Sequence, residues 1–242
     1  MAVVPLSGPI FSRTIEQYAG LFQGLERSGN IKGVMLEIES PGGSAVASEY
    51  LYDRLKRLNE KKPLYCYALM AASGGYMAAA AARKIYAPST GLVGSIGVLS
   101  IKPVVRGLME RAGISLEVMK KGAMKDMTLF HRESTEEERR VLESLQEDIY
   151  ERFIEMVSTA RSMPREKVRE LATGELFSGR RAGTLGLIDG VRDYQDALEE
   201  LSRETGVSPL KTMTLRPRKR LLKRVMTEAA GALADELWWR GL

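Results

Sequence analysis

A serine followed by two glycines, Ser73-Gly74-Gly75, is the part of this sequence best suited to nucleophilic chemistry. The apolar residues 64–71 before it predict a strand, and the alanine-rich stretch after it predicts a helix. The Ser73 hydroxyl would then lie beside the free N–H groups and the positive dipole end of a helix, where an oxyanion is stabilised. A serine that only caps the helix is the structural alternative, which the turn alone does not exclude.

A second glycine turn, SPGGS at residues 40–44, also follows a predicted strand and precedes a predicted helix. Its glycines can expose backbone N–H donors, and two such turns at the ends of neighbouring strands could jointly bind a developing negative charge. The two turns therefore indicate acyl-transfer chemistry, although Ser73 does not lie in the GxSxG pattern of many hydrolases.

The residue pattern does not decide which base would take the proton from Ser73. The only histidine, His131, lies in a polar stretch that is typical of a solvated loop. A lysine can act as a base only where burial or nearby positive charge lowers its pKa toward neutrality. Lys125 is flanked by methionines and small residues that could provide such burial, but the pattern does not single it out from the other lysines.

Composition indicates a globular protein with a sizeable core, and it predicts no cofactor and no metal site. The 242 residues are 44% apolar and carry a net charge of +5, with one histidine and one cysteine, Cys66, which is expected to be buried. One residue of each kind is too few for a zinc site or an internal disulfide, and no calcium-binding loop is seen. No apolar run reaches the roughly 20 residues of a membrane span, and the chain opens on a predicted strand, so any anchor is expected outside it.

Short apolar strands alternate with helical patterns in the first half of the chain, which predicts an α/β fold with a largely parallel sheet. The predicted strands are residues 2–6, 33–39, 64–71, 85–87, 92–99 and 115–119. The predicted helices are residues 14–27, 45–59, a stretch that ends near 83, 103–112, 135–161 and a short one that starts at Pro164, and residues 194–205 close the compact part. The longest helix has a capping box at Thr135 and Glu138 and an apolar stripe of Val141, Leu145, Ile149, Phe153 and Val157.

Residues 209–242 are predicted to form a separate basic, amphipathic tail. The tail contains a predicted strand at 211–215, then the basic run RPRKRLLKR, then an apolar helical stripe that ends near Trp238-Trp239. Such a segment could lie on an anionic membrane surface, or it could be a helix packed on an oligomer or a free C-terminus. Nucleic acid is not a predicted partner, because the basic run has no interleaved aromatic residues and no reading motif.

Four ordered motifs closely resemble the signal peptide peptidase A family, which belongs to the ClpP/crotonase superfamily. They are EIESPGGS (37–44), MAASGGYMAAAAARKIYA (70–87), TGLVGSIGVLS (90–100) and KKGAMKDM (120–127), and the match continues through FSGRRAGTLGLIDGV (177–191). The resemblance implies a ClpP/crotonase-like α/β fold of repeated ββα units with a long helix in the C-terminal half. It assigns residues 1–208 to the peptidase domain and 209–242 to the tail.

The resemblance also implies a serine endopeptidase with a Ser/Lys dyad and no cofactor. Ser73 matches the nucleophile, Lys125 the general base, and Ser95 the serine that orients the lysine. Gly43 and Gly74 match the backbone N–H donors of the oxyanion hole. All five positions are present in this chain.

The implied substrates are hydrophobic peptides, namely cleaved signal peptides that remain at the membrane. The implied assembly is a homo-oligomeric ring of about eight copies, in which neighbouring subunits complete the active sites. The implied location is the extracytoplasmic side of a prokaryotic plasma membrane, with the catalytic domain attached to the membrane.

Two other classes of function share part of this pattern. A crotonase-type acyl-CoA enzyme has the same fold and a similar pair of N–H donors but needs no serine nucleophile. A non-catalytic ring that organises the membrane would leave Ser73 unreactive toward an acylating probe. Binding of acyl-CoA and covalent labelling of Ser73 distinguish these classes from the peptidase.

Overall fold

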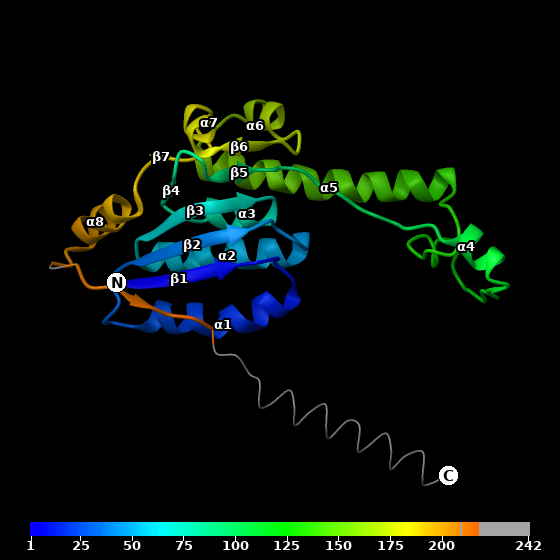
Figure 1. The fold of residues 1–242 in the computed structure, drawn as a ribbon, viewed down its shortest axis with the longest axis horizontal. Helices are drawn as coiled ribbons and strands as arrows, with labels where there is room; N and C mark the ends of the chain where they lie inside the picture. The colour runs from blue at the N-terminus through cyan, green and yellow to red at the C-terminus, as the bar shows by residue number, and fades with distance from the viewer. Residues whose placement is uncertain (209, 218–242) are drawn as a thin grey trace, which may run out of the picture.

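The computed structural model describes residues 1–208 and 210–217, and its central feature is an eight-stranded sheet (Figure 1). Three parallel strands form its middle: β1 (Ala2–Ser7), β2 (Val34–Ser40) and β3 (Leu64–Ala72). The strand order is β6-β5-β3-β2-β1-β8, and β4 also pairs with β3. The predicted α/β class with a largely parallel sheet is confirmed.

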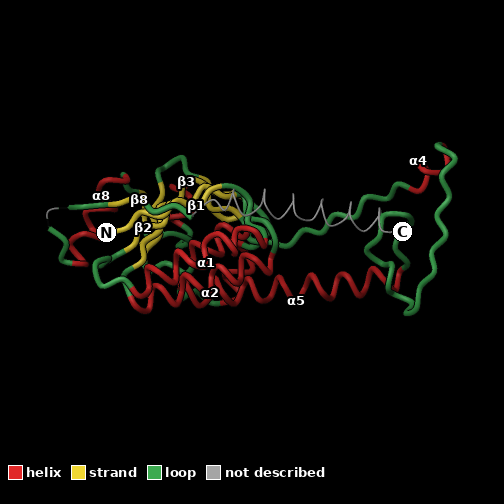
Figure 2. The backbone as a smooth tube through the Cα atoms, turned by 90° about the horizontal axis from the view of Figure 1, so that it is seen from below, coloured by secondary structure: helices red, strands yellow, loops and turns green. Residues whose placement is uncertain are grey.

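Helices cover both faces of this sheet. The helices α1 (Ser12–Arg27), α2 (Ala45–Lys61) and α3 (Gly74–Ala80) lie together on one face, while α8 (Tyr194–Thr205) lies on the other (Figure 2). Side chains alternate along each strand, so Leu36 and the buried Cys66 pack in the larger core beneath α1 to α3. Met35, Tyr65 and their neighbours pack against α8.

Shorter strands extend the sheet beside β3. They are β4 (Lys84–Ala87), β5 (Leu92–Gly94), β6 (Leu176–Ser178) and β7 (Gly190–Val191), connected in part by α6 (Arg165–Leu171) and α7 (Gly179–Thr184). The strand predicted at 92–99 is shorter than expected. It ends at Gly94 because Gly94 and Ser95 both adopt a positive φ, 110° and 50°, which turns the chain out of the sheet.

The long helix α5 (Glu136–Arg161) begins at the predicted capping box. The Thr135 Oγ1 accepts a hydrogen bond from the Glu138 N–H at 3.2 Å, and the Glu138 carboxylate accepts one from the Thr135 N–H at 2.8 Å. Phe153 and Val157 of the predicted stripe are buried in the core. Val141 and two more stripe residues, Leu145 and Ile149, are exposed, since this half of α5 projects beyond the sheet (Figure 1).

Residues 100–135, here called the arm, leave the sheet, carry α4 (Arg106–Arg111), and return to the start of α5 (Figure 1). The strand predicted at 115–119 is wrong. Its alternating residues Leu116 and Val118 are exposed, and no strand pairs with this stretch in the described part of the chain. An extended segment without a neighbouring strand has no partners for its backbone hydrogen bonds, so the apolar alternation alone does not make a strand.

The first residues of the predicted tail belong to the sheet. The strand predicted at 211–215 is present as β8 (Met213–Thr214), which pairs in parallel with β1. The predicted amphipathic helix falls within residues 218–242, outside the described residues, and the domain boundary at 208/209 stays a prediction. Within the described ranges, no helix combines the length and apolar character needed to cross a membrane.

Candidate active site

Ser73 occupies a sharp turn between β3 and α3. Its φ and ψ are 51° and −121°, a conformation that L-residues rarely adopt and that costs about 1–3 kcal/mol. The Ser73 N–H donates to the Gly94 carbonyl at 2.8 Å, which fixes the turn, and the side chain makes no capping hydrogen bond to α3. The simple helix-cap explanation is therefore not supported, and the strained turn holds the hydroxyl at the head of a helix.

The two glycine turns lie against each other, as the sequence predicts. A Cβ atom built on Gly42 would lie 2.6 Å from the Gly74 nitrogen, and one built on Gly74 would lie 3.4 Å from the Gly43 nitrogen. Ile10 holds the first turn in place, because its N–H donates to the Gly42 carbonyl and its carbonyl accepts from Ser44, both at 2.8 Å. In the described residues, the Gly43 and Gly74 N–H groups donate to no other atom, so both are free to bind an oxyanion.

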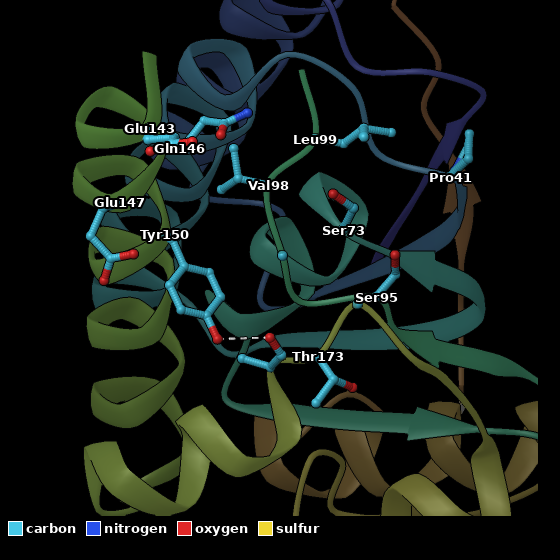
Figure 3. A pocket seen from close by; sticks show the side chains of 13 residues that line it. Pro41, Ser73, Ser95, Val98, Leu99, Glu143, Gln146, Glu147, Tyr150 and Thr173 are labelled. Carbon is cyan, nitrogen blue, oxygen red and sulfur yellow. Dashed lines mark hydrogen bonds between the residues drawn. The ribbon is translucent and has the colours of Figure 1, made fainter. Parts of the chain in front are cut away.

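Ser95 lies beside Ser73, at the first residue after β5 (Figure 3). Its φ of 50° and the hydrogen bond from its N–H to the Glu175 carbonyl, at 2.7 Å, hold this loop against residues 172–175. The two segments are joined again one residue later, where the Gly174 N–H donates to the Ile96 carbonyl at 2.9 Å. The structure therefore brings Ser73, Ser95 and both glycine turns to one place.

A cavity of about 700 Å³ opens at Ser73 and Ser95, within the size range of ligand pockets. The face of α5 forms one side of the cavity, and the apolar lining side chains are those of Pro41, Val98 and Leu99 together with Ala172 (Figure 3). The hydroxyl of Tyr150 donates to the Ala172 carbonyl at 2.8 Å and so joins α5 to the loop that supports Ser95. The remaining lining residues are Gly97, Glu143, Gln146, Glu147, Thr173 and Gly174.

Lys125 lies in the arm, outside this cavity, and its side chain is exposed. The lining residues stop at Leu99 and resume at Glu143, so none of them comes from the arm, which lies at the far end of α5 (Figure 1). His131 is also in the arm, where its Nε2 lies 3.3 Å from the Asp126 carboxylate. Its side chain is only 13% exposed, so it is more enclosed than the solvated loop histidine that the sequence predicts. Within one subunit, the structure does not bring either candidate base to Ser73.

Comparison with protein families shows what kind of protein has this site. The model of peptidase family S49 matches residues 56–208, which include Ser73, Ser95 and Lys125. The chain belongs to peptidase family S49. A second family model, Clp protease, matches residues 2–93 of this S49 peptidase and so covers the parallel strands and the Ser73 turn. The predicted class, a serine peptidase with a Clp-like fold, is confirmed.

Individual relatives agree with this membership. A candidate protease of Synechocystis sp. is 33% identical over 228 residues, which are 93% of this chain and 82% of the relative. A candidate protease of Methanocaldococcus jannaschii is 36% identical over 79% of this chain and 62% of its own length. A candidate signal peptide peptidase SppA of Enterococcus faecium is 35% identical over 72% of this chain. This S49 chain spans 51% of the Enterococcus relative, which is thus considerably longer than the matched part.

Sequence reasoning missed the α5 side of the candidate active site. Gln146 and Glu147 lie three and four residues after Glu143, and Tyr150 lies four and three residues after them, so all four share a face of α5. The spacing identifies the face, but only the packing of α5 across α3 shows that it lines the Ser73 cavity. Among the described residues, no group of three or more His, Cys, Asp or Glu side chains is arranged to hold a metal ion.

Gly43→Ala is expected to lower kcat about 10²- to 10³-fold, the usual effect of losing one oxyanion donor. The added Cβ would lie 2.1 Å from the Ile10 carbonyl oxygen, and the φ of 159° disfavours a side chain, so the Gly43 N–H must move. Steady-state hydrolysis of a fluorogenic hydrophobic peptide measures the loss. Gly24→Ala is the control, since its Cβ on α1 meets nothing within 4 Å. A folded Gly43→Ala protein with normal kcat would show that the Gly43 N–H is not an oxyanion donor.

Proposed function

We propose that this protein is an endopeptidase that cuts hydrophobic peptides with a Ser/Lys dyad shared between two subunits. Ser73 of one subunit is the nucleophile, and Lys125 of a neighbouring subunit is the general base. The observation that carries the proposal is the separation of the two groups. Ser73 has its oxyanion donors but no lysine or histidine among the residues lining its cavity, while Lys125 is exposed on a projecting arm.

The proposed reaction begins with an uncharged Lys125 amine, which accepts the Ser73 hydroxyl proton as the Ser73 oxygen attacks the scissile carbonyl. The N–H groups of Gly43 and Gly74 stabilise the resulting oxyanion. The protonated amine then gives its proton to the leaving nitrogen, and an acyl-enzyme forms on Ser73. In the second half, the amine takes a proton from water as the water oxygen attacks the ester carbonyl, and it returns that proton to the Ser73 oxygen as the ester bond breaks. The Ser95 hydroxyl orients the amine throughout.

The cavity supports hydrophobic peptides as substrates. Val98 and Leu99 are among its apolar lining residues, together with Pro41 and Ala172, whereas the two carboxylates of the lining, Glu143 and Glu147, both lie on α5. Apolar burial of this kind contributes about 25 cal/mol per Å² and favours extended apolar segments over polar ones. Remnant signal peptides have this chemistry, and we place the enzyme at the membrane, with its catalytic domain on the extracytoplasmic side.

The exposed apolar residues of the arm support assembly into a homo-oligomeric ring, for which eight copies is the proposed number. A surface with this many large apolar side chains is typical of an interaction site. Packing against a neighbouring subunit would bury this surface and carry Lys125 toward the next Ser73. The exposed arm residues are Ile101, Val104, Leu108, Ile114, Leu116, Val118, Met119, Leu129 and Phe130.

Mixed assemblies of two inactive variants test the shared dyad. Ser73→Ala and Lys125→Ala subunits, co-expressed with different affinity tags and purified through both, are each expected to be inactive alone. A mixed oligomer is expected to regain about a quarter of wild-type activity, because random mixing places an intact Ser73 beside an intact Lys125 at about that frequency. Mixed oligomers that remain inactive would show that the two groups do not come from different subunits.

The acyl-CoA alternative is not favoured by these observations. The S49 match and the strained Ser73 turn both point to a serine nucleophile, which acyl-CoA chemistry of the crotonase type does not require. Binding of acyl-CoA in a titration with the intact protein would reopen that alternative.

A further inference from the structure

An ionic cluster encloses the residue that follows Lys125. The Asp126 side chain is 5% exposed, and its carboxylate accepts hydrogen bonds from Arg132, through Nε at 3.1 Å and Nη2 at 2.9 Å. Lys120 also donates to it, and His131 Nε2 lies 3.3 Å away. The hydrogen bonds from Arg132, and then from Lys120, hold the pKa of Asp126 well below its usual range. Asp126 is therefore an ionised anchor directly beside Lys125.

The same guanidinium also binds Glu138 in the first turn of α5. Arg132 Nη1 donates to Oε2 of Glu138 at 2.8 Å, and Nη2 donates to Oε1 at 2.5 Å. Glu138 is 3% exposed, and the bonds from Arg132 and from the Thr135 N–H lower its pKa to about 2. One planar group therefore joins the carboxylate beside Lys125 to the carboxylate that caps α5, which a lysine could not do in the same geometry.

The turn that carries Lys125 depends on such anchoring because it has no regular structure of its own. Residues 112–135 contain no helix or strand in the structure. The Lys125 N–H donates to the Gly122 carbonyl at 3.2 Å, which closes a single turn. A second tether comes from Lys102, whose Nζ donates to the Met127 carbonyl at 2.8 Å. Side-chain contacts from outside the turn thus determine where Lys125 lies.

The helix α5 extends this anchoring to the body of the protein. It has 26 residues, so it is about 39 Å long. Glu138 lies in its first turn, Tyr150 lines the Ser73 cavity, and Phe153 is buried in the core (Figures 1 and 3). A turn fixed to Glu138 is therefore fixed to a helix that is held in the core at its other end.

We infer that Arg132 is a positioning residue for Lys125, because it joins Asp126 to Glu138 and so fixes the Lys125 turn on α5. This inference rests on the proposed Ser/Lys dyad and adds a residue to it. Proton transfer from Ser73 requires the amine at about 2.6–3.2 Å from the hydroxyl oxygen, and a displacement of about 1 Å costs about 10²-fold in rate. A displaced turn would lower kcat and leave the peptide cavity unchanged.

Arg132→Lys in the full chain tests this role. Lysine keeps a positive charge between the two carboxylates, beside Lys120 and His131, but cannot bind both as a fork. We expect kcat on a fluorogenic hydrophobic peptide to fall about 10- to 100-fold, with KM changed less than about twofold. The pH–rate profile is recorded as a second readout of where the amine lies.

Arg139→Lys, in the first turn of α5, is the matched control for Arg132→Lys. Arg139 is about half exposed, and its ion pairs with Glu133 and Glu136 are also exposed, so we expect kcat and the pH–rate profile to stay within about twofold of wild type. An unchanged kcat and pH–rate profile for Arg132→Lys, together with an inactive Lys125→Ala, would overturn the positioning role and leave the dyad standing. An active Lys125→Ala would overturn both.

Glu138→Gln provides a second test if Arg132→Lys does not fold. The glutamine oxygen can still accept from the Thr135 N–H and from Arg132 Nη1, but the amide nitrogen cannot accept from Nη2 and the charge is lost, so we expect a fall of about 3- to 10-fold in kcat with KM retained. A variant that melts at a lower temperature but has wild-type kcat and pH–rate profile below that temperature would show that the cluster only stabilises the arm. That outcome contradicts the inference.

Discussion

Replacing Ser73 with alanine is expected to abolish peptide hydrolysis, lowering kcat about 10⁴- to 10⁶-fold, as in other serine peptidases that lose their nucleophile. The expectation follows from the turn, which places the hydroxyl at the head of α3 beside the N–H groups of Gly43 and Gly74. Steady-state assays with a fluorogenic hydrophobic peptide measure the loss. A fluorophosphonate probe, read by mass spectrometry of the labelled peptide, is expected to modify Ser73 in the wild type and nothing in the variant.

Two features make Ser73→Ala a clean test. The side chain makes no capping hydrogen bond, so its removal leaves no unpaired partner, and alanine at a φ of 51° costs about 1–2 kcal/mol. Ser95→Ala is the matched comparison, because Ser95 lines the same cavity and has a similar φ of 50°. It is expected to be labelled at Ser73 more slowly than the wild type, because it keeps the nucleophile but loses the hydroxyl that orients the Lys125 amine. Labelling of the Ser73→Ala protein at another serine, with retained turnover, would assign the nucleophile elsewhere.

The Ser73 turn could be predicted from sequence because the pattern that indicates it is local. An apolar strand, a serine with two glycines and an alanine-rich helix follow one another within about 20 residues. The hydrogen bond from the Ser73 N–H to the Gly94 carbonyl, which fixes the turn, is not part of that pattern. The Gly42-Gly43 turn is equally local. Their mutual contact follows from the parallel pairing of β2 with β3, which places the ends of both strands at one edge.

The surroundings of Ser95 could not be predicted in the same way. Apolar residues continue through Val98 and Leu99, so the pattern extends the strand, whereas the chain leaves the sheet after Gly94. The departure is stabilised by the carbonyl of Glu175, which lies 80 positions further along the chain. A non-local hydrogen bond of this kind leaves no mark in the hydrophobic pattern of either segment.

The arm and the first half of α5 show a different limit of pattern reasoning. The stripe of Val141, Leu145 and Ile149 continues without a break into the buried Phe153 and Val157, so helical periodicity is the same in both halves. Periodicity predicts that one face is apolar but not whether the same chain or another chain covers it. Hence the pattern did not place Lys125, and its assignment as the base came from the family resemblance.

Lys125→Ala is expected to lower kcat about 10⁴-fold or more, since removal of the base leaves Ser73 as an ordinary alcohol. Lys125→Arg is expected to be equally inactive, because a guanidinium stays protonated at all accessible pH values and cannot accept the serine proton. Lys121→Ala is the matched control. Lys121 is exposed four residues earlier in the same segment, and we expect its loss to change kcat by less than about twofold.

The pH dependence of the wild-type enzyme follows from the proton transfer from Ser73 to Lys125. Only the uncharged amine can accept a proton from Ser73, so kcat/KM is expected to rise with pH as the Lys125 ammonium loses its proton, and to level off in the alkaline range. A histidine base would instead give a rise centred near pH 6.5 that levels off close to neutrality. A profile that is already flat at neutral pH, together with loss of activity in His131→Ala, would assign the base to His131. If the wild type shows an alkaline rise and the residual activity of Lys125→Ala does not, the general base is Lys125.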